Sequence, residues 1–315
     1  MCFYNLIFMK KIFFSKNKVF KAWKITLKVI GGICIFVVLL FAGVFVAMKL
    51  HLTNVRGKVD SASQTYNNLK STSAKEEVAA QTVGPWTDTP EWAVISGGFE
   101  KDKDMIDNVS RETDVPSRLI VSTIISEQFR FFNSNREAFK RFFQPLGILG
   151  NATQFSYGVA GIKTNTAMTI ENNLKDPTSP YYPGAQYEHL LDFSTNNPDK
   201  ERMDRLTDSH NHYYSYLYTA LLLKEEMAQW KNAGYDISNR PEILATLFNI
   251  GFSHSNPNPN PETGGADITV NGEDYTFGSL AFSFYYSNQL NQYFSKDNGL
   301  ASVENPDGST HAILQ

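Results

Sequence analysis

The stretch SRLIVSTIISEQFRFF (residues 117–132) decides the fold, because it is a strongly apolar segment that carries a single acidic side chain. With 3.6 residues per turn, Glu127 shares a helix face with Ile120, Thr123, Ile124 and Phe131, and we expect that face to be buried. Burial penalises the charged form of a carboxyl group, so this position favours a general acid. The alternative is that the helix rotates slightly and Glu127 lies at a solvated rim.

Charge is distributed unevenly along the chain. Residues 1–58 contain ten Lys or Arg and no Asp or Glu, whereas the remainder contains 19 basic and 32 acidic residues. Binding to nucleic acid needs a basic face. The acidic remainder therefore predicts no nucleic-acid partner.

Residues 29–48, VIGGICIFVVLLFAGVFVAM, are 20 consecutive residues without a charge, and seven lysines precede them. A helix of this length crosses a hydrocarbon core of ~30 Å, and the positive-inside rule places the lysines in the cytoplasm. We predict a single-pass protein of the plasma (inner) membrane, with everything beyond the helix extracytoplasmic. A cleaved signal peptide fits less well, because the leading region is long and no Ala-x-Ala site follows. A buried soluble helix is the other alternative.

The domain organisation follows from composition. The segment after the apolar helix is polar and has no apolar stripe to bury. Both cysteines, Cys2 and Cys34, precede it, which excludes a disulfide or a Cys-ligated zinc ion beyond the membrane. We predict a basic cytoplasmic tail, a transmembrane helix, a polar stalk, a mainly helical domain with a small β-hairpin, and a flexible tail: 1–28, 29–50, 51–89, 90–294 and 295–315.

Helical signals dominate the domain. Asn271-Gly272 between two short β-prone runs predicts a hairpin at 268–277. Residues 176–208 contain prolines and little periodicity, which indicates a long surface excursion or a lid. Proline, glycine and aspartate at the expected boundaries predict helices over 103–112, 115–132, 135–143, 165–173, 211–230, 241–250 and 277–291.

Two further motifs carry candidate site residues. In SYGVAGIKTNTA (residues 156–167), small residues from Gly158 to Gly161 allow a ligand or a neighbouring segment to come close, although helix packing is the more common cause. In ATLFNIG (residues 245–251), Asn249 either ties two backbone segments together or offers a hydrogen bond into a cleft.

The order of these motifs resembles that of lytic murein transglycosylases of the soluble-lytic-transglycosylase type, which have a lysozyme-like fold. The resemblance rests on Glu127 at the end of its motif, on Ser156-x-Gly158 with Ile162-Lys163, and on Phe248-Asn249-x-Gly251, and it covers roughly residues 103–286. It implies that Glu127 is catalytic. It also implies that the substrate contacts include a tyrosine late in the domain, and the candidates are Ser156, Gly158, Gly161, Ile162, Lys163, Phe248, Asn249, Tyr285 and Tyr286.

The chain departs from the family pattern at three positions. Gln128 stands where the family has Ser, Gly161 where Gln is common, and Phe248 where Tyr is usual. The missing Gln removes an expected hydrogen bond to the sugar. These departures therefore weaken the part of the resemblance that concerns the sugar contacts in that subsite.

The resemblance implies cleavage of the β-1,4 bond between N-acetylmuramic acid and N-acetylglucosamine, with a 1,6-anhydro product. Glu127 would protonate the leaving oxygen and then accept a proton from the C6 hydroxyl, so no cofactor and no metal is needed. The pair His210-x-His212 lacks a surrounding ligand framework, which favours ordinary surface histidines. The implied partners are the glycan strands of peptidoglycan.

Other functions remain open from the sequence. A goose-type lysozyme would activate water with an aspartate, for which the candidates are Asp176, Asp192 and Asp204. A non-catalytic peptidoglycan-binding scaffold is the second alternative. A tether to a secretion or conjugation complex is compatible with the enzyme. The loop at residues 256–261, NPNPNP, is interpreted as a groove wall or as a plain surface connection.

Overall fold

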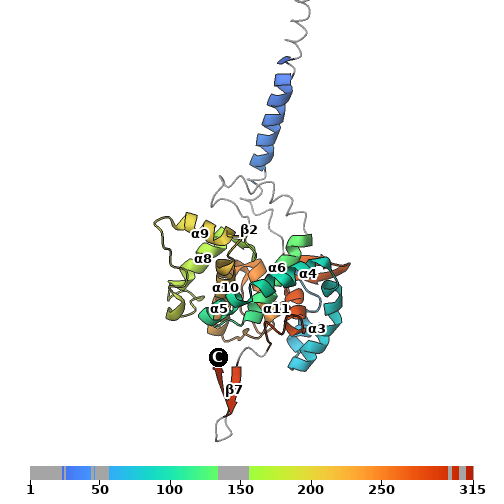
Figure 1. Ribbon diagram of the computed structural model, residues 1–315, viewed down its shortest axis with the longest axis vertical. Helices are drawn as coiled ribbons and strands as arrows, with labels where there is room; N and C mark the ends of the chain where they lie inside the picture. Colours follow the sequence, from blue (N-terminus) through green and yellow to red (C-terminus); the bar gives the residue numbers. More distant parts are fainter. Residues whose placement is uncertain are drawn as a thin grey trace, which may run out of the picture. The chain divides into compact units, whose positions relative to one another are not determined.

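The computed structural model describes residues 23–24, 26–43, 46, 57–133, 156–296, 300–304 and 310–314. The chain separates into two compact units, Met1–Asn54 and Val55–Gln315. In the described part of the first unit, residues Thr26–Gly43 form a helix that is long and apolar enough to cross a membrane (Figure 1). Its large side chains are exposed, for example Phe36 at 66% and Leu39 at 65%. The uncharged run of the sequence predicts a helix of this kind.

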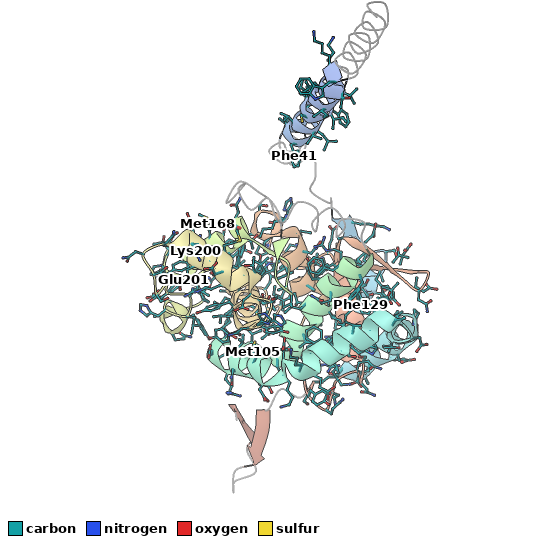
Figure 2. All side chains as sticks on the ribbon, turned by 45° about the horizontal axis from the view of Figure 1, so that its top comes forward. Phe41, Met105, Phe129, Met168, Lys200 and Glu201 are labelled. Atoms are coloured by element: carbon teal, nitrogen blue, oxygen red, sulfur yellow. The ribbon has the colours of Figure 1, made fainter. Side chains whose placement is uncertain are left out.

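The described part of the second unit is mainly helical, as predicted. Apolar side chains such as Phe129 lie between the helices (Figure 2). The helices are α2 (Ser63–Asn68), α3 (Thr72–Thr87), α4 (Pro90–Lys101), α5 (Lys103–Thr113), α6 (Ser117–Asn133), α8 (Thr164–Leu174), α9 (Pro198–Thr207), α10 (Tyr213–Asn232), α11 (Pro241–Ile250) and α12 (Phe277–Tyr286), with short 3-10 helices η2 (Ala185–Tyr187) and η3 (Phe252–His254).

The described strands form two-stranded antiparallel sheets. The predicted hairpin is confirmed as β5 (Asp267–Val270) and β6 (Glu273–Thr276), and its turn residues Asn271 and Gly272 have φ of 51° and 85°. Two positive φ values are what a two-residue type I′ turn requires. The other pairs are β1 (Lys58–Val59) with β4 (Gly264–Gly265), β2 (Ser156–Tyr157) with β3 (Ile162–Lys163), and β7 (Leu300–Glu304) with β8 (Thr310–Leu314).

Helix α6 lies in the middle of the second unit and packs against α4, α5, α10, α11, α12 and β5 (Figure 1). Its residues 118–127 are all buried, so the helix is enclosed on every side and does not present a single apolar face. Near its start, the Arg118 guanidinium donates hydrogen bonds to backbone carbonyls at the end of α12, including those of Phe284 (2.9 Å) and Ser287 (2.8 Å). These bonds join the start of α6 to the end of α12, where the Phe284 carbonyl also accepts from the Ser287 N–H.

The described part of the expected stalk, residues 57–89, is instead part of the fold. Helix α3 packs against α12, and Trp86 is completely buried, with its indole N–H donating to Ser283 Oγ at 2.9 Å. Strand β1 pairs with β4, which joins Lys58 to Gly265. The stalk prediction is therefore wrong here, because a few large aromatic side chains anchor a segment whose average composition is polar.

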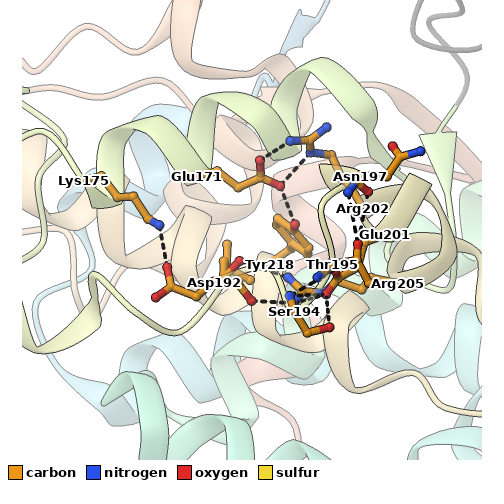
Figure 3. A network of polar contacts seen from close by, with 11 residues as sticks. Glu171, Lys175, Asp192, Ser194, Thr195, Asn197, Glu201, Arg202, Arg205 and Tyr218 are labelled. Atoms are coloured by element: carbon orange, nitrogen blue, oxygen red, sulfur yellow. Dashed lines mark hydrogen bonds and ion pairs between the residues drawn. The ribbon is translucent and has the colours of Figure 1, made fainter. Parts of the chain in front are cut away.

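The segment at 176–208 contains η2 and α9, and a polar network ties it to the domain (Figure 3). Arg202 of α9 donates to Glu171 of α8 at 2.7 Å, and Arg205 donates to the Leu191 carbonyl at 3.0 Å. Both arginines are buried; the Arg202 pair joins the excursion to α8, whereas the Arg205 bond joins two parts of the excursion to each other.

Other boundaries differ modestly from the expectations. Helix α12 ends at Tyr286, five residues before the predicted end, and Leu290 just beyond it has a φ of 52°. The expected flexible tail, 295–315, contains the hairpin of β7 and β8. The helix expected at 135–143 lies outside the described residues.

Candidate active site

Glu127 is buried within α6, as the helix periodicity predicts. It is 2% exposed, and Ile120, Thr123 and Ile124 on the same face are completely buried. Exposure rises toward the end of the helix, to 14% for the Arg130 side chain and 48% for Phe132. Glu127 therefore lies about one turn below the surface of the described chain, and the alternative of a solvated rim is wrong.

Arg130 forms a two-pronged ion pair with Glu127. The arginine Nε donates to Oε2 at 2.8 Å, and Nη2 donates to Oε1. The planar guanidinium matches both oxygens of a carboxylate, which gives the pair a defined geometry. The sequence analysis missed this contact, although the i, i+3 spacing in α6 is a known signal for ion pairs.

The loop of small residues packs directly on the Glu127 carboxyl group. Gly161 has a φ of 62°, and a Cβ added to it would overlap Glu127 Oε1. Gly158 has a φ of 69°, and a Cβ added there would overlap the Leu206 carbonyl oxygen and Ser215 Oγ. Both glycines are thus required by conformation and by space. The segment that approaches this loop closely is the helix carrying Glu127.

A second contact joins the same loop to α6. The side-chain amide of Gln128 donates to the Val159 carbonyl, and Ala160 is completely buried. Glu127 and Gln128, which are neighbours on α6, therefore contact this loop at Gly161 and at Val159. Within the loop, the Gly161 N–H donates to the Gly158 carbonyl at 3.2 Å.

The loop continues into the β2–β3 pair. Ser156 is paired through its backbone with Lys163, and Tyr157 with Ile162, whose side chain is 3% exposed. Ile162 therefore serves the core, while Lys163 is half-buried. Of the sequence-predicted residues, the structure brings Gly161 into contact with Glu127.

Asn249 ties two backbone segments together. Its Oδ1 accepts a hydrogen bond from the Ala266 N–H at 2.8 Å, and a Cβ added to Gly265 would lie 3.0 Å from the same oxygen. Phe248 stacks on Phe277 with ring centroids 6.1 Å apart. Helix α11 packs against α6, so this motif supports the helix that bears Glu127.

Tyr285 and Tyr286 lie near the opposite end of α6. Both are buried, and the Arg118 guanidinium is 5.9 Å from the Tyr285 ring centroid. Arg118 precedes Glu127 by nine residues, which is about 13 Å of helix rise. The Tyr286 hydroxyl donates to the Asn239 carbonyl at 3.3 Å, and burial raises its pKa. The structure therefore places these tyrosines in the core and not at Glu127.

The three aspartates of the goose-type alternative lie on the surface. Asp192 binds Lys175 and His189, and Asp204 binds Lys200 (Figure 3 shows the Asp192 pair). Asp176 accepts hydrogen bonds from the N–H and hydroxyl of Thr178, which lower its pKa. Each of these three carboxylates therefore has a local partner at the surface of the described chain.

Two further buried acids lie side by side on α10. Glu225 accepts from Asn173 Nδ2 at 2.9 Å and Glu226 from Ser255 Oγ at 2.7 Å, while the Oε1 atom of each has no hydrogen-bond partner. Burial raises the pKa of Glu226 to about 7 and that of Glu225 well above its usual range. Both are completely buried. The sequence did not single them out, because they directly follow Lys224 and so look like part of a charged, solvated face.

The histidine motif and the proline loop are structural in this fold. His212 Nδ1 lies 2.6 Å from Asp102 Oδ2, which also accepts from the Tyr216 hydroxyl. Within the described residues, no cluster of three or more His, Cys, Asp or Glu could hold a metal ion. The loop at 256–261 is fastened at Pro261, whose carbonyl accepts from Asn67 of α2.

Comparison of the chain with protein-family models, curated proteins and solved structures found no match.

Proposed function

We propose that this protein is a membrane-anchored lytic transglycosylase with a lysozyme-like catalytic domain, and that it cleaves the glycan strands of peptidoglycan. The observation that carries the proposal is the contact between Glu127 and Gly161. Two motifs that are 34 residues apart in the sequence and ordered as in the transglycosylase family meet at one carboxyl group. A buried carboxyl group held against a turn is suited to proton transfer.

The proposed reaction uses one carboxyl group twice. Glu127 donates a proton to the glycosidic oxygen as the bond from that oxygen to C1 of N-acetylmuramic acid breaks, and the acetamido group of the substrate stabilises the sugar cation. The ionised Glu127 then accepts the proton of the C6 hydroxyl while O6 bonds to C1. The carboxyl group ends protonated, and the product carries a 1,6-anhydro ring.

The location of the protein is part of the proposal. The helix at Thr26–Gly43 would anchor the chain in the plasma membrane, and the lysines before it would remain in the cytoplasm. The domain would then face the cell wall, where its substrate is. Local opening of the wall for a secretion or conjugation complex fits such an anchored enzyme.

A non-catalytic scaffold that binds peptidoglycan is the second candidate. The ion pair between Arg130 and Glu127 favours it, because a carboxylate with both oxygens occupied is also what a purely structural residue shows. This candidate predicts that Glu127→Gln leaves glycan binding and phenotype unchanged, and that neither the wild type nor the variant cleaves the glycan.

Digestion of purified peptidoglycan by the full-length chain in detergent, followed by mass spectrometry, tests the proposal. We expect 1,6-anhydro ends from the wild type and at least a 100-fold slower release from Glu127→Gln, because general acid catalysis contributes about 10²- to 10⁴-fold. Glu242→Gln is the matched control, since Glu242 is also 2% exposed and paired with an arginine, Arg240. Reducing ends in place of anhydro ends would identify a hydrolase, and equal absence of cleavage would identify a scaffold.

A further inference from the structure

The Ser255 hydroxyl has more hydrogen-bond partners than its single proton can serve. Its Oγ lies 2.7 Å from Glu226 Oε2 and 2.9 Å from the indole nitrogen of Trp230, and it also contacts Gln229 Oε1. A hydroxyl group has one donor and two acceptor sites. Because the Trp230 N–H takes one acceptor site, the oxygens of Glu226 and Gln229 compete for the one Ser255 proton.

Tyr181 fixes the orientation of the Gln229 amide. Ser255 and Gln229 both hydrogen-bond to the Tyr181 hydroxyl, whose own proton goes to the Phe252 carbonyl at 3.0 Å. The tyrosine oxygen then only accepts, so it takes the NH₂ end of Gln229 and leaves Oε1 facing Ser255. The Ser255 proton therefore already has other acceptors, and the contact with Glu226 needs a proton on Glu226.

The surroundings of Glu226 agree with a neutral carboxyl group. Its side chain is completely buried, and its Oε1 atom has no hydrogen-bond partner among the described residues. An ionised carboxylate in this position would leave charge on a buried, unpaired oxygen. Burial also raises the pKa of Glu226 to about 7, which acts in the same direction as the hydrogen-bond count.

The contact joins α10 to the segment that follows α11. Residues Phe252–His254 form η3 directly after Gly251, and the Ser255 N–H donates to the Phe252 carbonyl at 3.1 Å. The Tyr181 ring packs edge-to-face on Phe252 with ring centroids 4.9 Å apart. The bond between Glu226 and Ser255 therefore holds residues 252–255, and through them Tyr181, on α10.

We propose that Glu226 and Ser255 form a pH-sensitive latch, which a proton on Glu226 closes by bonding to Ser255 Oγ, and which opens and releases residues 252–255 from α10 when Glu226 loses that proton to water. Release lets water reach the carboxylate, which removes the cost of a buried charge. This inference goes beyond the proposed function and does not depend on it, since the latch lies outside the contact between Glu127 and Gly161.

The direction of the pH dependence follows from the two states of Glu226. Its pKa is about 7 when the latch is closed and near the ordinary 4.5 when water reaches it. The closed latch thus holds a proton that the open one releases, so the contact is complete below pH 4.5 and is lost as the pH rises to about 7. Opening should increase about tenfold per pH unit between these limits and level off above pH 7.

Other ionisable groups near the latch have to be separated from Glu226. Glu225 precedes it on α10 and accepts from Asn173, and the Nδ1 atom of His254 lies 3.0 Å from the Ile250 carbonyl. Lys163 of β3 also has a partner. On the other elements packed against α10, and on α10 itself, charged side chains form further contacts: Asp102 with His212, Glu112 with Tyr213, Glu127 with Arg130, Glu171 with Arg202, Glu201 with Arg205, Glu242 with Arg240, and Lys224 with the Tyr187 ring.

Hydrogen–deuterium exchange of the full-length protein in detergent tests the latch, with peptides that cover residues 251–256 and a correction for the intrinsic exchange rate at each pH. We expect protection of this segment to fall about tenfold per pH unit between pH 5 and 7. Glu226→Gln should keep the protection at every pH, because an amide N–H donates to Ser255 Oγ as the protonated acid does. Glu225→Gln and His254→Gln are the matched controls and should retain the fall.

Ser255→Ala removes the other half of the latch, at a residue that is only half-buried. We expect its segment to exchange at least tenfold faster than the wild type at pH 5 and to show no fall with pH. Peptides from α3 report the integrity of the fold, and if Glu226→Gln lowers their protection, Ser255→Ala decides. A wild type without the fall, or a fall retained in either variant, would overturn the latch. Since no substrate is present, these outcomes are distinct from failure of the proposed enzyme activity.

Discussion

At the scale of single residues, the space beside Glu127 is available only because Gly161 has no side chain. The glycine meets two requirements at once, a φ of 62° and the close approach of a carboxyl group. The sequence motif predicted that something would come close to this loop. It did not predict that the approaching group would be the proposed catalytic residue itself.

Replacement of Gly161 by alanine should therefore destabilise the fold by more than the penalty for a left-handed φ alone. We expect the free energy of unfolding to fall by about 2 to 4 kcal/mol, from a φ penalty of about 1 to 2 kcal/mol and the overlap with Glu127. Gly234→Ala is the control, because Gly234 has a φ of 90° with open space around it and should show only the φ penalty. Urea unfolding followed by tryptophan fluorescence measures both, and equal losses would contradict the contact.

Glu226 predicts an unusual dependence of stability on pH. Its pKa is raised by burial to about 7, so the folded protein holds a proton that the unfolded chain releases near pH 4.5. Stability from this group is present below pH 4.5 and is lost as the pH rises to about 7. Glu226→Gln should remove that loss, and the variant should gain about 3 kcal/mol over the wild type between these pH values.

The pKa of Glu201 is shifted in the opposite direction to that of Glu226, so its effect on stability has the opposite dependence on pH. The backbone N–H groups of Ser194 and Thr195 lower its pKa to about 2, so its contribution is present at neutral pH and is lost as the pH falls toward 2. Glu201→Gln should therefore lower stability at pH 7 and converge with the wild type in acid. Thermal unfolding across pH 3 to 8 compares the two variants, and parallel curves for them would refute both assignments.

At the scale of elements, α3 lies in the core of the domain, whereas the sequence predicted a polar stalk at this position. Trp86 packs edge-to-face on Trp92 with ring centroids 4.9 Å apart and lies 6.3 Å from the Phe284 ring. Tyr275 donates to the Thr82 carbonyl from β6, which adds a polar tie between distant segments. Residues 57–89 are therefore needed for the core between α3, α4 and α12.

Trp86→Ala tests this role of α3. We expect a loss of about 3 to 5 kcal/mol, because the change leaves a large cavity and removes one of the two hydrogen bonds that Ser283 Oγ accepts, the other coming from Thr82 Oγ1. Val94→Ala on the next helix is the control, since Val94 is 63% exposed and should change stability by less than about 0.5 kcal/mol. A stalk that does not contribute to the core would tolerate both changes equally in chemical denaturation.

At the scale of the whole molecule, the described domain begins close in sequence to the apolar helix. Strand β1 starts at Lys58, and the uncharged run ends at residue 48, so nine residues connect the two. The sequence between the uncharged run and the described domain is therefore shorter than the predicted stalk of 51–89.

The proposed topology is tested by cysteine labelling in intact cells. After replacement of Cys2 and Cys34 by serine, Lys200→Cys on exposed α9 should react with a membrane-impermeant maleimide, because the domain is proposed to face outward. Lys16→Cys should react only after the cells are permeabilised. The reverse pattern would place the domain in the cytoplasm, where it could not reach peptidoglycan.

The sequence by itself determined the features that depend on neighbours in the chain. Apolar periodicity predicted α6 and the burial of Glu127, Asn271-Gly272 predicted the β5–β6 turn, and the uncharged run predicted the N-terminal helix. Helix periodicity, turn conformation and span length are set by residues a few positions apart, so they can be read from the chain directly.

Only the tertiary structure decided what meets Glu127 and what closes the core. The contact with Gly161 and the bond from Trp86 to Ser283 join residues 34 and 197 positions apart, and the same packing moved Tyr285 away from the site. Such contacts depend on how whole helices are arranged in space. In residues 57–89 the average composition is polar, and it does not reveal that a few aromatic side chains place this segment in the core.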